Sequence, residues 1–99
     1  MQLKFIPIGT DAKALEEYLI NDFCKEVYHV YEQLYSKIGF HFPWIGYFIL
    51  HQNKIVGVGG YKGPPNDNRI EIAYGVIPEK EGQGFATEIC KQLIITYKA

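Results

Sequence analysis

The chain has 99 residues and a formal net charge of −1, and 47% of its residues are hydrophobic and 15% aromatic. A chain of this length forms one domain at most, so we expect residues 1–99 to make a single compact unit. The hydrophobic content is ample for a packed core and excludes a disordered chain. The balanced charge, without a run of Lys or Arg, argues against nucleic acid or a membrane surface as the partner.

The cysteines and the chain start indicate the compartment. Cys24 and Cys90 are the only cysteines, and neither belongs to a CxxC pair or to a metal-ligand spacing. We therefore expect two free thiols and no metal site. The first residues lack the pattern of a signal peptide, and no apolar run approaches the ~20 residues of a membrane span. These features predict a soluble, cytoplasmic protein.

The first part of the chain predicts a strand and two helices. Residues 2–8 are typical of a short strand, in which Pro7 suits an edge position. Thr10 or Asp11 can cap a helix over residues 12–20, and Asn21-Asp22 can cap a second helix. Gly39 would end that helix. Its apolar positions follow helical spacing and are Phe23, Val27, Val30, Tyr31, Leu34 and Ile38.

The second part predicts three strands and a final helix. Residues 44–50 and 55–61 flank a turn in which Asn53 can take a positive φ, so they form a hairpin. Residues 62–68 read as an exposed loop. Residues 69–77 alternate as a strand, with Glu71, Ala73 and Gly75 on one face and Ile72, Tyr74 and Val76 on the other.

Residues 84–98 have the period of an amphipathic helix. Its apolar stripe contains Phe85, Ala86, Ile89, Cys90, Leu93 and Tyr97, and Ile95 lies on the opposite side. The expected order is thus β-α-α-β-β-β-α. An antiparallel meander packed by helices belongs to the α+β class.

The glycine-rich turn Gly82-Gln83-Gly84, between this last strand and helix, is the arrangement that binds phosphates. The first N–H groups of a helix have no internal partner, and the helix dipole attracts anions. A glycine at these positions lets a phosphate approach the backbone. A plain turn needs the same residues, so the spacing alone leaves both possibilities open. The P-loop and the dinucleotide fingerprint are excluded because their Gly-Lys-Ser/Thr and GxGxxG patterns do not occur.

The sequence of residues 70–88, IEIAYGVIPEKEGQGFATE, closely resembles the central motif of the GNAT superfamily of N-acetyltransferases. That motif is a strand, a [Gln/Arg]-x-x-Gly-x-[Gly/Ala] loop and a helix. The resemblance extends to the order of elements along the whole chain. It also implies that the strands and helix that complete a GNAT domain after this motif are lacking. One position departs from the pattern, since Glu81 stands where the family has Gln or Arg.

The resemblance implies the site residues. In the family, the loop and helix start bind the pyrophosphate of acetyl-CoA mainly through backbone N–H groups, and the strand end pairs with the pantetheine arm. The residues at the matching positions are Val76, Ile77, Gly82, Gln83, Gly84, Phe85, Ala86 and Thr87. A Glu on this strand often accepts the proton of the amine in GNAT enzymes, which makes Glu71 the candidate base. A carboxylate on a solvated face or in an ion pair is the alternative for Glu71.

The region of the second helix and the segment after it lines the acceptor pocket in relatives. Its aromatic residues are Tyr28, Tyr31, Tyr35, Phe40, Phe42 and Trp44, although such a stripe is more often core. His29, His41 and His51 are expected at the surface or at helix ends. Two functions remain open: transfer of acetyl from acetyl-CoA to a primary amine, or a catalytically incomplete domain that only binds CoA. The uncovered edge of the last strand predicts a homodimer.

Overall fold

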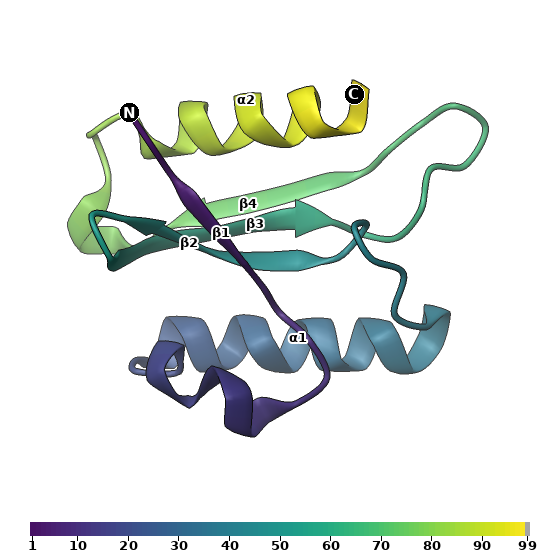
Figure 1. The fold of residues 1–99 in the computed structure, drawn as a ribbon, viewed down its shortest axis with the longest axis horizontal. Helices are drawn as coiled ribbons and strands as arrows, with labels where there is room; N and C mark the ends of the chain where they lie inside the picture. The colour runs from purple at the N-terminus through teal and green to yellow at the C-terminus, as the bar shows by residue number, and fades with distance from the viewer. Residues whose placement is uncertain (99) are drawn as a thin grey trace.

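The computed structural model describes residues 1–98 and has the expected α+β architecture, with elements in the order that the sequence predicts (Figure 1). The elements are β1 (Lys4–Pro7), the 3-10 helix η1 (Ala12–Tyr18), α1 (Asp22–Ile38), β2 (Gly46–His51), β3 (Lys54–Tyr61), β4 (Ile72–Val76), the 3-10 turn η2 (Pro78–Lys80) and α2 (Phe85–Lys98).

The four strands form one antiparallel sheet in the order β1-β2-β3-β4. The β2–β3 hairpin turns at Gln52 and Asn53, whose φ angles are 51° and 64°. Two consecutive residues of positive φ match the right-handed twist of the strands, which confirms the predicted hairpin. β1 is an edge strand, and Pro7 there needs no N–H for a further neighbour. β4 is the opposite edge within residues 1–98.

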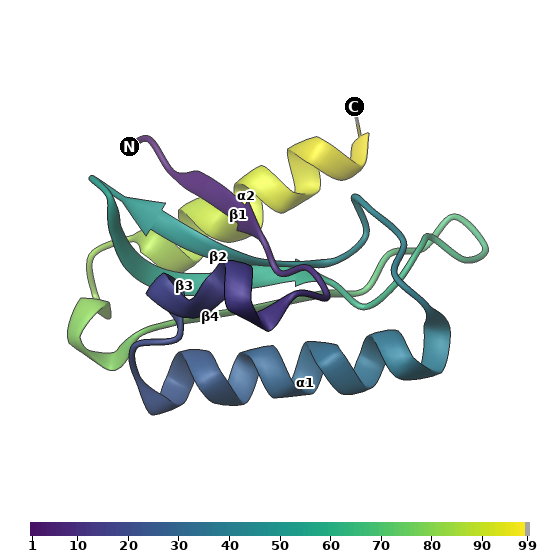
Figure 2. The same ribbon diagram turned by 60° about the horizontal axis from the view of Figure 1, so that its bottom comes forward.

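The sheet lies between two helical layers, with η1 and α1 on one face and α2 on the other (Figure 2). Tyr31 of α1 lies over Gly46 and Gly60, where an added Cβ would come within 2.5 Å and 3.0 Å of its ring and hydroxyl. On the other face, a Cβ at Gly59 would meet Ile89 Cγ2 of α2 at 2.6 Å. Small residues in the central strands therefore let both helices approach the sheet closely.

The ends of α1 confirm the predicted signals. The Asn21 side chain accepts a hydrogen bond from Cys24 N at 2.8 Å, and Gly39 ends the helix with a φ of 87°. The first helix differs from the expectation. It is a 3-10 helix over Ala12–Tyr18, capped by Asp11, and not a longer α-helix over residues 12–20. This helix between β1 and α1 has only seven residues before the chain reaches the N-cap of α1. Short connecting helices often adopt 3-10 geometry.

Two apolar faces are less buried than expected. On α1, Cys24, Tyr31 and Tyr35 point into the core, whereas Val30 and Ile38 are 57% and 41% exposed. On α2, Ala86 is exposed and Phe85, Ile89 and Leu93 are buried, with Ile95 exposed as expected. The apolar stripe of α1 is wider than the sheet that it covers, because β4 is the last described strand on that side.

The predicted strand over residues 69–77 is shorter in the structure. Asp67 and Asn68 both have positive φ, and Asn66 and Arg69 exchange two hydrogen bonds of 2.9 Å. The backbone of Arg69 is thus used in a tight turn, and β4 begins at Ile72. The alternation within β4 is confirmed: Gly75 faces Phe23 of α1, and Tyr74 lies opposite Gly59 on the α2 face.

Candidate functional site

The loop between β4 and α2 exposes the start of the helix. Gly82 and Gly84 have φ angles of 80° and 87°, which residues with a side chain rarely adopt. The first hydrogen bond of the helix runs from Glu88 N to Gly84 O at 3.2 Å. The N–H groups of Phe85, Ala86 and Thr87 therefore have no acceptor within α2. Phe85 is only 4% exposed and packs on the ring of His51, with centroids 5.2 Å apart, so the helix start is held firmly against the sheet.

A hollow of about 250 Å³ lies in front of these N–H groups. Its lining residues are Val76, Lys80, Glu81, Gly82, Gly84, Phe85, Ala86 and Thr87. Six of the eight candidate CoA-binding residues are thus brought together, whereas Gln83 and Ile77 lie outside the lining. Lys80 is a cation that the sequence analysis did not identify, and it lines the hollow together with Glu81, the next residue in the chain. An anion in the hollow would meet backbone N–H groups, a helix dipole and one ammonium group.

The surroundings of Gly82 and Gly84 show whether the hollow has room for a phosphate. A Cβ built at Gly82 meets no atom within 4 Å, and one at Gly84 meets only Met1 Cε at 4.0 Å. The space above both residues is therefore open, and packing does not explain their small size. Glycine is explained instead by the positive φ angles and by the free access of a ligand to the N–H groups. Both features fit a bound pyrophosphate.

The hydrogen-bond pattern of β4 identifies its free edge. Glu71 O accepts from Lys62 N at 3.0 Å, and Ile77 N donates to Val56 O at 2.9 Å. Residues of an antiparallel strand direct their backbone groups alternately to the two sides. The backbone N–H and C=O groups of Ile72, Tyr74 and Val76 therefore point away from β3, toward the open edge. Ile77 uses its N–H inside the fold, and its carbonyl accepts from Lys80 N at 2.8 Å.

A second hollow, of about 620 Å³, lies between α1 and the β3–β4 pair. Its apolar wall comes from α1, and its floor comes from Val58, Gly59, Ala73, Tyr74 and Gly75. The residues of α1 that line it include Phe23, Val27, Val30, Tyr31 and Leu34. The small residues Ala73 and Gly75 thus leave room on the face of β4 that is turned toward α1. Burial raises the pKa of Tyr31 far above its ordinary value, so its phenol stays neutral and can donate a hydrogen bond.

Glu71 lies next to this second hollow and is not part of its lining. Its side chain is 72% exposed and contacts Lys62, with Oε2 and Nζ 3.3 Å apart. Lys62 itself lines the hollow. An exposed ion pair of this kind adds little stability.

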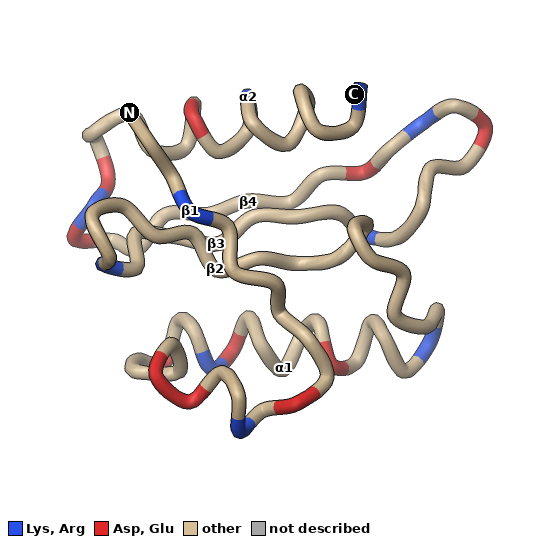
Figure 3. The backbone as a smooth tube through the Cα atoms, in the orientation of Figure 1, with Lys and Arg blue, Asp and Glu red and all other residues tan. Residues whose placement is uncertain are grey.

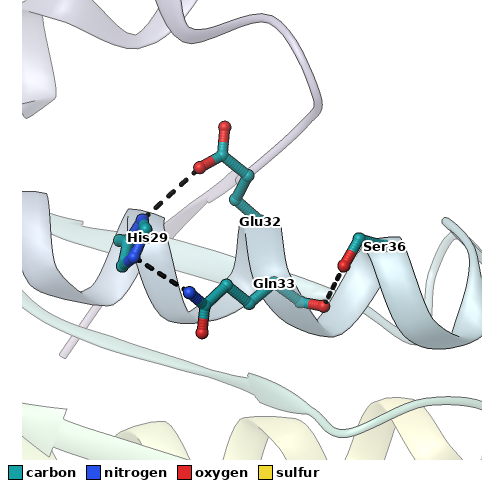
Figure 4. A network of polar contacts seen from close by, with 4 residues as sticks. All are labelled: His29, Glu32, Gln33 and Ser36. Atoms are coloured by element: carbon teal, nitrogen blue, oxygen red, sulfur yellow. Dashed lines mark hydrogen bonds and ion pairs between the residues drawn. The ribbon is translucent and has the colours of Figure 1, made fainter.

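Among the other candidate side chains, Tyr35, His29 and His41 line neither hollow. Tyr35 donates to Ile8 O at 2.8 Å and accepts from Gly46 N at 3.2 Å, so it joins α1 to the sheet. His29 lies on the exposed face of α1 in a network with Glu32 and Gln33 (Figure 4). The ring of His41 is bonded to Ile38 O at the end of α1. These positions confirm the surface and helix-end roles of His29 and His41.

The family follows from a comparison with known proteins. The model of the acetyltransferase (GNAT) family matches residues 12–99. The chain belongs to the GNAT acetyltransferase family. This places the loop at Gly82–Gly84 in a family of acetyl-transferring enzymes, and the α+β fold agrees with it.

A solved structure from Bordetella pertussis, described as a GnaT-family acetyltransferase, shares this fold with a TM-score of 0.60 and 18% sequence identity. The match covers 98% of this chain and 68% of the Bordetella chain. No curated protein sequence matches the GNAT chain significantly. Among the described residues, no helix is long and apolar enough to span a bilayer, and no three His, Cys, Asp or Glu side chains gather as metal ligands.

Proposed function

We propose that this GNAT-family chain binds acetyl-CoA and transfers its acetyl group to a primary amine. One observation carries the proposal: Val76 lines the hollow at the start of α2 and also offers free backbone groups at the edge of β4. A single extended ligand can therefore place a pyrophosphate on the helix start and run along the edge of the strand. CoA has this shape, with a pyrophosphate joined to a long arm that contains two amides.

Different residues bind the pyrophosphate and the pantetheine arm of CoA. The N–H groups of Phe85, Ala86 and Thr87 and the ammonium of Lys80 hold the pyrophosphate. Gly82 and Gly84 keep the approach open, and Gln83 and Ile77 support the loop from outside the lining. Val76 pairs with the amides of the arm in the manner of an added strand. The carboxylate of Glu81 opposes the anion, and its neighbour Lys80 offsets that repulsion.

The thioester would then lie near Tyr74, beside the hollow between α1 and β4. An amine held in that hollow attacks the carbonyl carbon, a C–N bond forms, the C–S bond breaks, and CoA leaves as the thiolate. Glu71 takes the proton that the amine loses. The aromatic and aliphatic wall of α1 excludes water from the amine and favours its neutral, nucleophilic form.

The second candidate function is binding of CoA without transfer. The exposure of Glu71 favours it, because a carboxylate open to water is a weak and poorly oriented base. We also propose that the chain forms a homodimer. The free thiols of Cys24 and Cys90 support a reducing compartment such as the cytoplasm. Lys, Arg, Asp and Glu are scattered over both helices and the loops, with the two signs interspersed (Figure 3).

Calorimetric titration with acetyl-CoA tests the proposal. We expect binding by the natural chain and none by Gly84→Glu, which places a carboxylate in the hollow. A panel of primary amines then separates the two functions. Release of CoA that depends on an amine supports transfer, and bound acetyl-CoA that is consumed no faster with amines than by hydrolysis supports binding alone. Absence of binding in both variants would refute the CoA site.

A further inference from the structure

The face of the sheet that is turned toward α1 carries an ion pair beside the hollow of about 620 Å³. Lys62 directly follows β3 and Glu71 directly precedes β4, and Lys62 N donates to Glu71 O at 3.0 Å, so the two residues lie opposite each other. Alternation along the strands puts Lys62 on the same face as Gly60, which Tyr31 of α1 covers. It puts Glu71 on the same face as Ala73, in the floor of the hollow. A segment placed beside the edge of β4 would leave all of these groups on that face.

The charged groups that line the hollow are divided between its two ends. Lys62 precedes Gly63, where an added Cβ would come within 2.8 Å of Ile38 Cδ1, so Lys62 lies near the last turn of α1. Lys37 belongs to the same turn and also lines the hollow. Glu26 lines it three turns earlier, about 16 Å away along the helix. The end at Lys62 therefore holds two ammonium groups, which attract a carboxylate of a ligand.

Tyr31 brings a hydrogen-bond donor to the same region. Its buried side chain lines the hollow, and an added Cβ at Gly60 would lie 3.0 Å from its hydroxyl oxygen. Within residues 1–98 every fully buried side-chain nitrogen or oxygen has a hydrogen-bond partner. Three other buried tyrosines donate their hydroxyls to backbone carbonyls, namely Tyr35, Tyr47 and Tyr61. The Tyr31 hydroxyl has no such partner in the described part of the chain, so it is open to the hollow.

The middle of the hollow has an apolar wall and a floor of small residues. On the wall, Val30 is 57% exposed, and Val27 and Leu34 are half-buried. On the floor, a Cβ built at Gly75 meets only Phe23 Cζ at 3.6 Å, which is an ordinary contact. Packing therefore does not require a glycine there, and the free space suits an apolar group that would remove the wall from water. The volume is in the range of small-molecule sites.

We infer that the acceptor held in this hollow is a free α-amino acid with an apolar side chain, an inference that rests on the proposed function. The carboxylate of the substrate pairs with the ammonium of Lys62 and accepts a hydrogen bond from the Tyr31 hydroxyl. Gly60 and Lys62 are two residues apart on one face, about 7 Å, so the flexible Lys62 side chain can reach the same carboxylate as Tyr31. The side chain of the substrate lies on the α1 wall, and its amino group lies toward Glu71.

Binding of the carboxylate also prepares the base. When the substrate carboxylate takes the place of Glu71 at Lys62, Glu71 leaves its ion pair and faces the amino group. The ammonium of the amino acid loses one proton to water and becomes nucleophilic. The C–N bond then forms at the thioester carbonyl, the C–S bond breaks, Glu71 takes the second proton from nitrogen, and the thiolate of CoA is the leaving group. An amine without a carboxylate leaves Lys62 paired with Glu71, so it binds more weakly and meets an engaged base.

Three matched acceptors test the role of the carboxylate. 3-Methylbutylamine is L-leucine without its carboxylate, and L-leucinamide carries a neutral amide in the same place. We expect kcat/KM for L-leucine to exceed that of either compound by about 10- to 100-fold, measured as release of CoA at saturating acetyl-CoA. The amine of L-leucine is less basic than the first and more basic than the second, so basicity cannot produce a preference over both. L-Asparagine, with a polar side chain of similar size, should be a poor acceptor.

Substitutions in the hollow test which groups hold the carboxylate. Lys62→Met keeps the length of the side chain and removes its charge, so KM for L-leucine should rise about 10- to 100-fold at unchanged kcat. KM for 3-methylbutylamine should not rise. Tyr31→Phe removes only the hydroxyl and should raise KM for L-leucine to a smaller extent. Lys25→Met is the matched control and should change neither KM, because Lys25 is an exposed lysine of α1 that does not line the hollow.

Calorimetry of L-leucine with the chain in the absence of acetyl-CoA adds a readout that does not depend on turnover. Binding should be measurable and weakened by Lys62→Met. Equal kcat/KM for L-leucine and 3-methylbutylamine, or equal effects of Lys62→Met and Lys25→Met, would overturn the amino-acid site and leave transfer to amines standing. L-Leucine that binds without any acceptor being acetylated would overturn the proposed transfer and with it the role of the amino acid. Absence of both binding and amine-dependent release of CoA would overturn both.

Discussion

Substitution of Gly84 by Ala separates the role of the glycine loop in folding from its role in binding. Gly84 and Gly39 have the same φ of 87°, a value that residues with a side chain rarely adopt. Gly84 lines the hollow at the start of α2, whereas Gly39 ends α1 far from it in the chain. Gly39→Ala is therefore a matched control for backbone strain without any change in the hollow.

The structure gives the expected stability cost. A Cβ at Gly84 meets only Met1 Cε at 4.0 Å, and one at Gly39 meets His41 Nε2 at 3.1 Å, a close contact that a small shift of the exposed His41 ring relieves. Holding a residue with a side chain at such a φ costs about 1–3 kcal/mol. In a domain of this size each kcal/mol lowers the Tm by about 4–8 °C. Both variants should remain folded at low temperature and lose stability to a similar extent.

Binding should distinguish the two variants. The new methyl group at Gly84 stands between a phosphate and the N–H groups of the helix start, and loss of one hydrogen bond to a charged group costs about 1.5–3 kcal/mol. Acetyl-CoA should then bind about 10- to 100-fold more weakly to Gly84→Ala, while Gly39→Ala binds as the natural chain does. Calorimetry at a temperature where circular dichroism shows both variants folded measures the difference. Equal affinities in the two variants would refute the phosphate-binding role of the loop.

Three further predictions concern single side chains. If Glu71 is the base, Glu71→Gln should lower kcat by about a hundredfold at unchanged KM. Lys62→Met breaks the same ion pair and should leave kcat unchanged. Equal effects of the two substitutions would show that Glu71 acts only as an ion-pair partner. Burial makes Cys24 inaccessible and raises the pKa of its thiol. A maleimide should therefore label the half-buried Cys90 first. Mass spectrometry that finds Cys24 labelled first would contradict the packing of α1. Burial raises the pKa of Tyr47 from 10.0 to about 12, so the folded chain keeps a proton that the unfolded chain loses. Stability in urea should accordingly be constant below about pH 10 and fall as the pH rises from there toward 12, and a flat profile up to pH 12 would refute this.

The sequence predicted most elements because their signals are local. Asn21 and Gly39 mark the ends of α1 through hydrogen bonds and a positive φ that involve only neighbouring residues. The β2–β3 turn and the glycine loop before α2 are specified in the same way. The 3-10 geometry of Ala12–Tyr18 and the late start of β4 were missed, since each depends on how a short segment connects two other elements.

The sequence by itself determined the family motif, the order of elements and the identity of the glycine loop, because these depend on residue types at fixed spacing. Only the tertiary structure decided which of these residues share a surface. It brought Lys80 into the hollow and left Gln83 and Ile77 outside its lining. It also assigned the free backbone groups to Ile72, Tyr74 and Val76, since the direction of an N–H depends on the register with β3. A register is a contact between distant parts of the chain, and spacing along the sequence does not encode it.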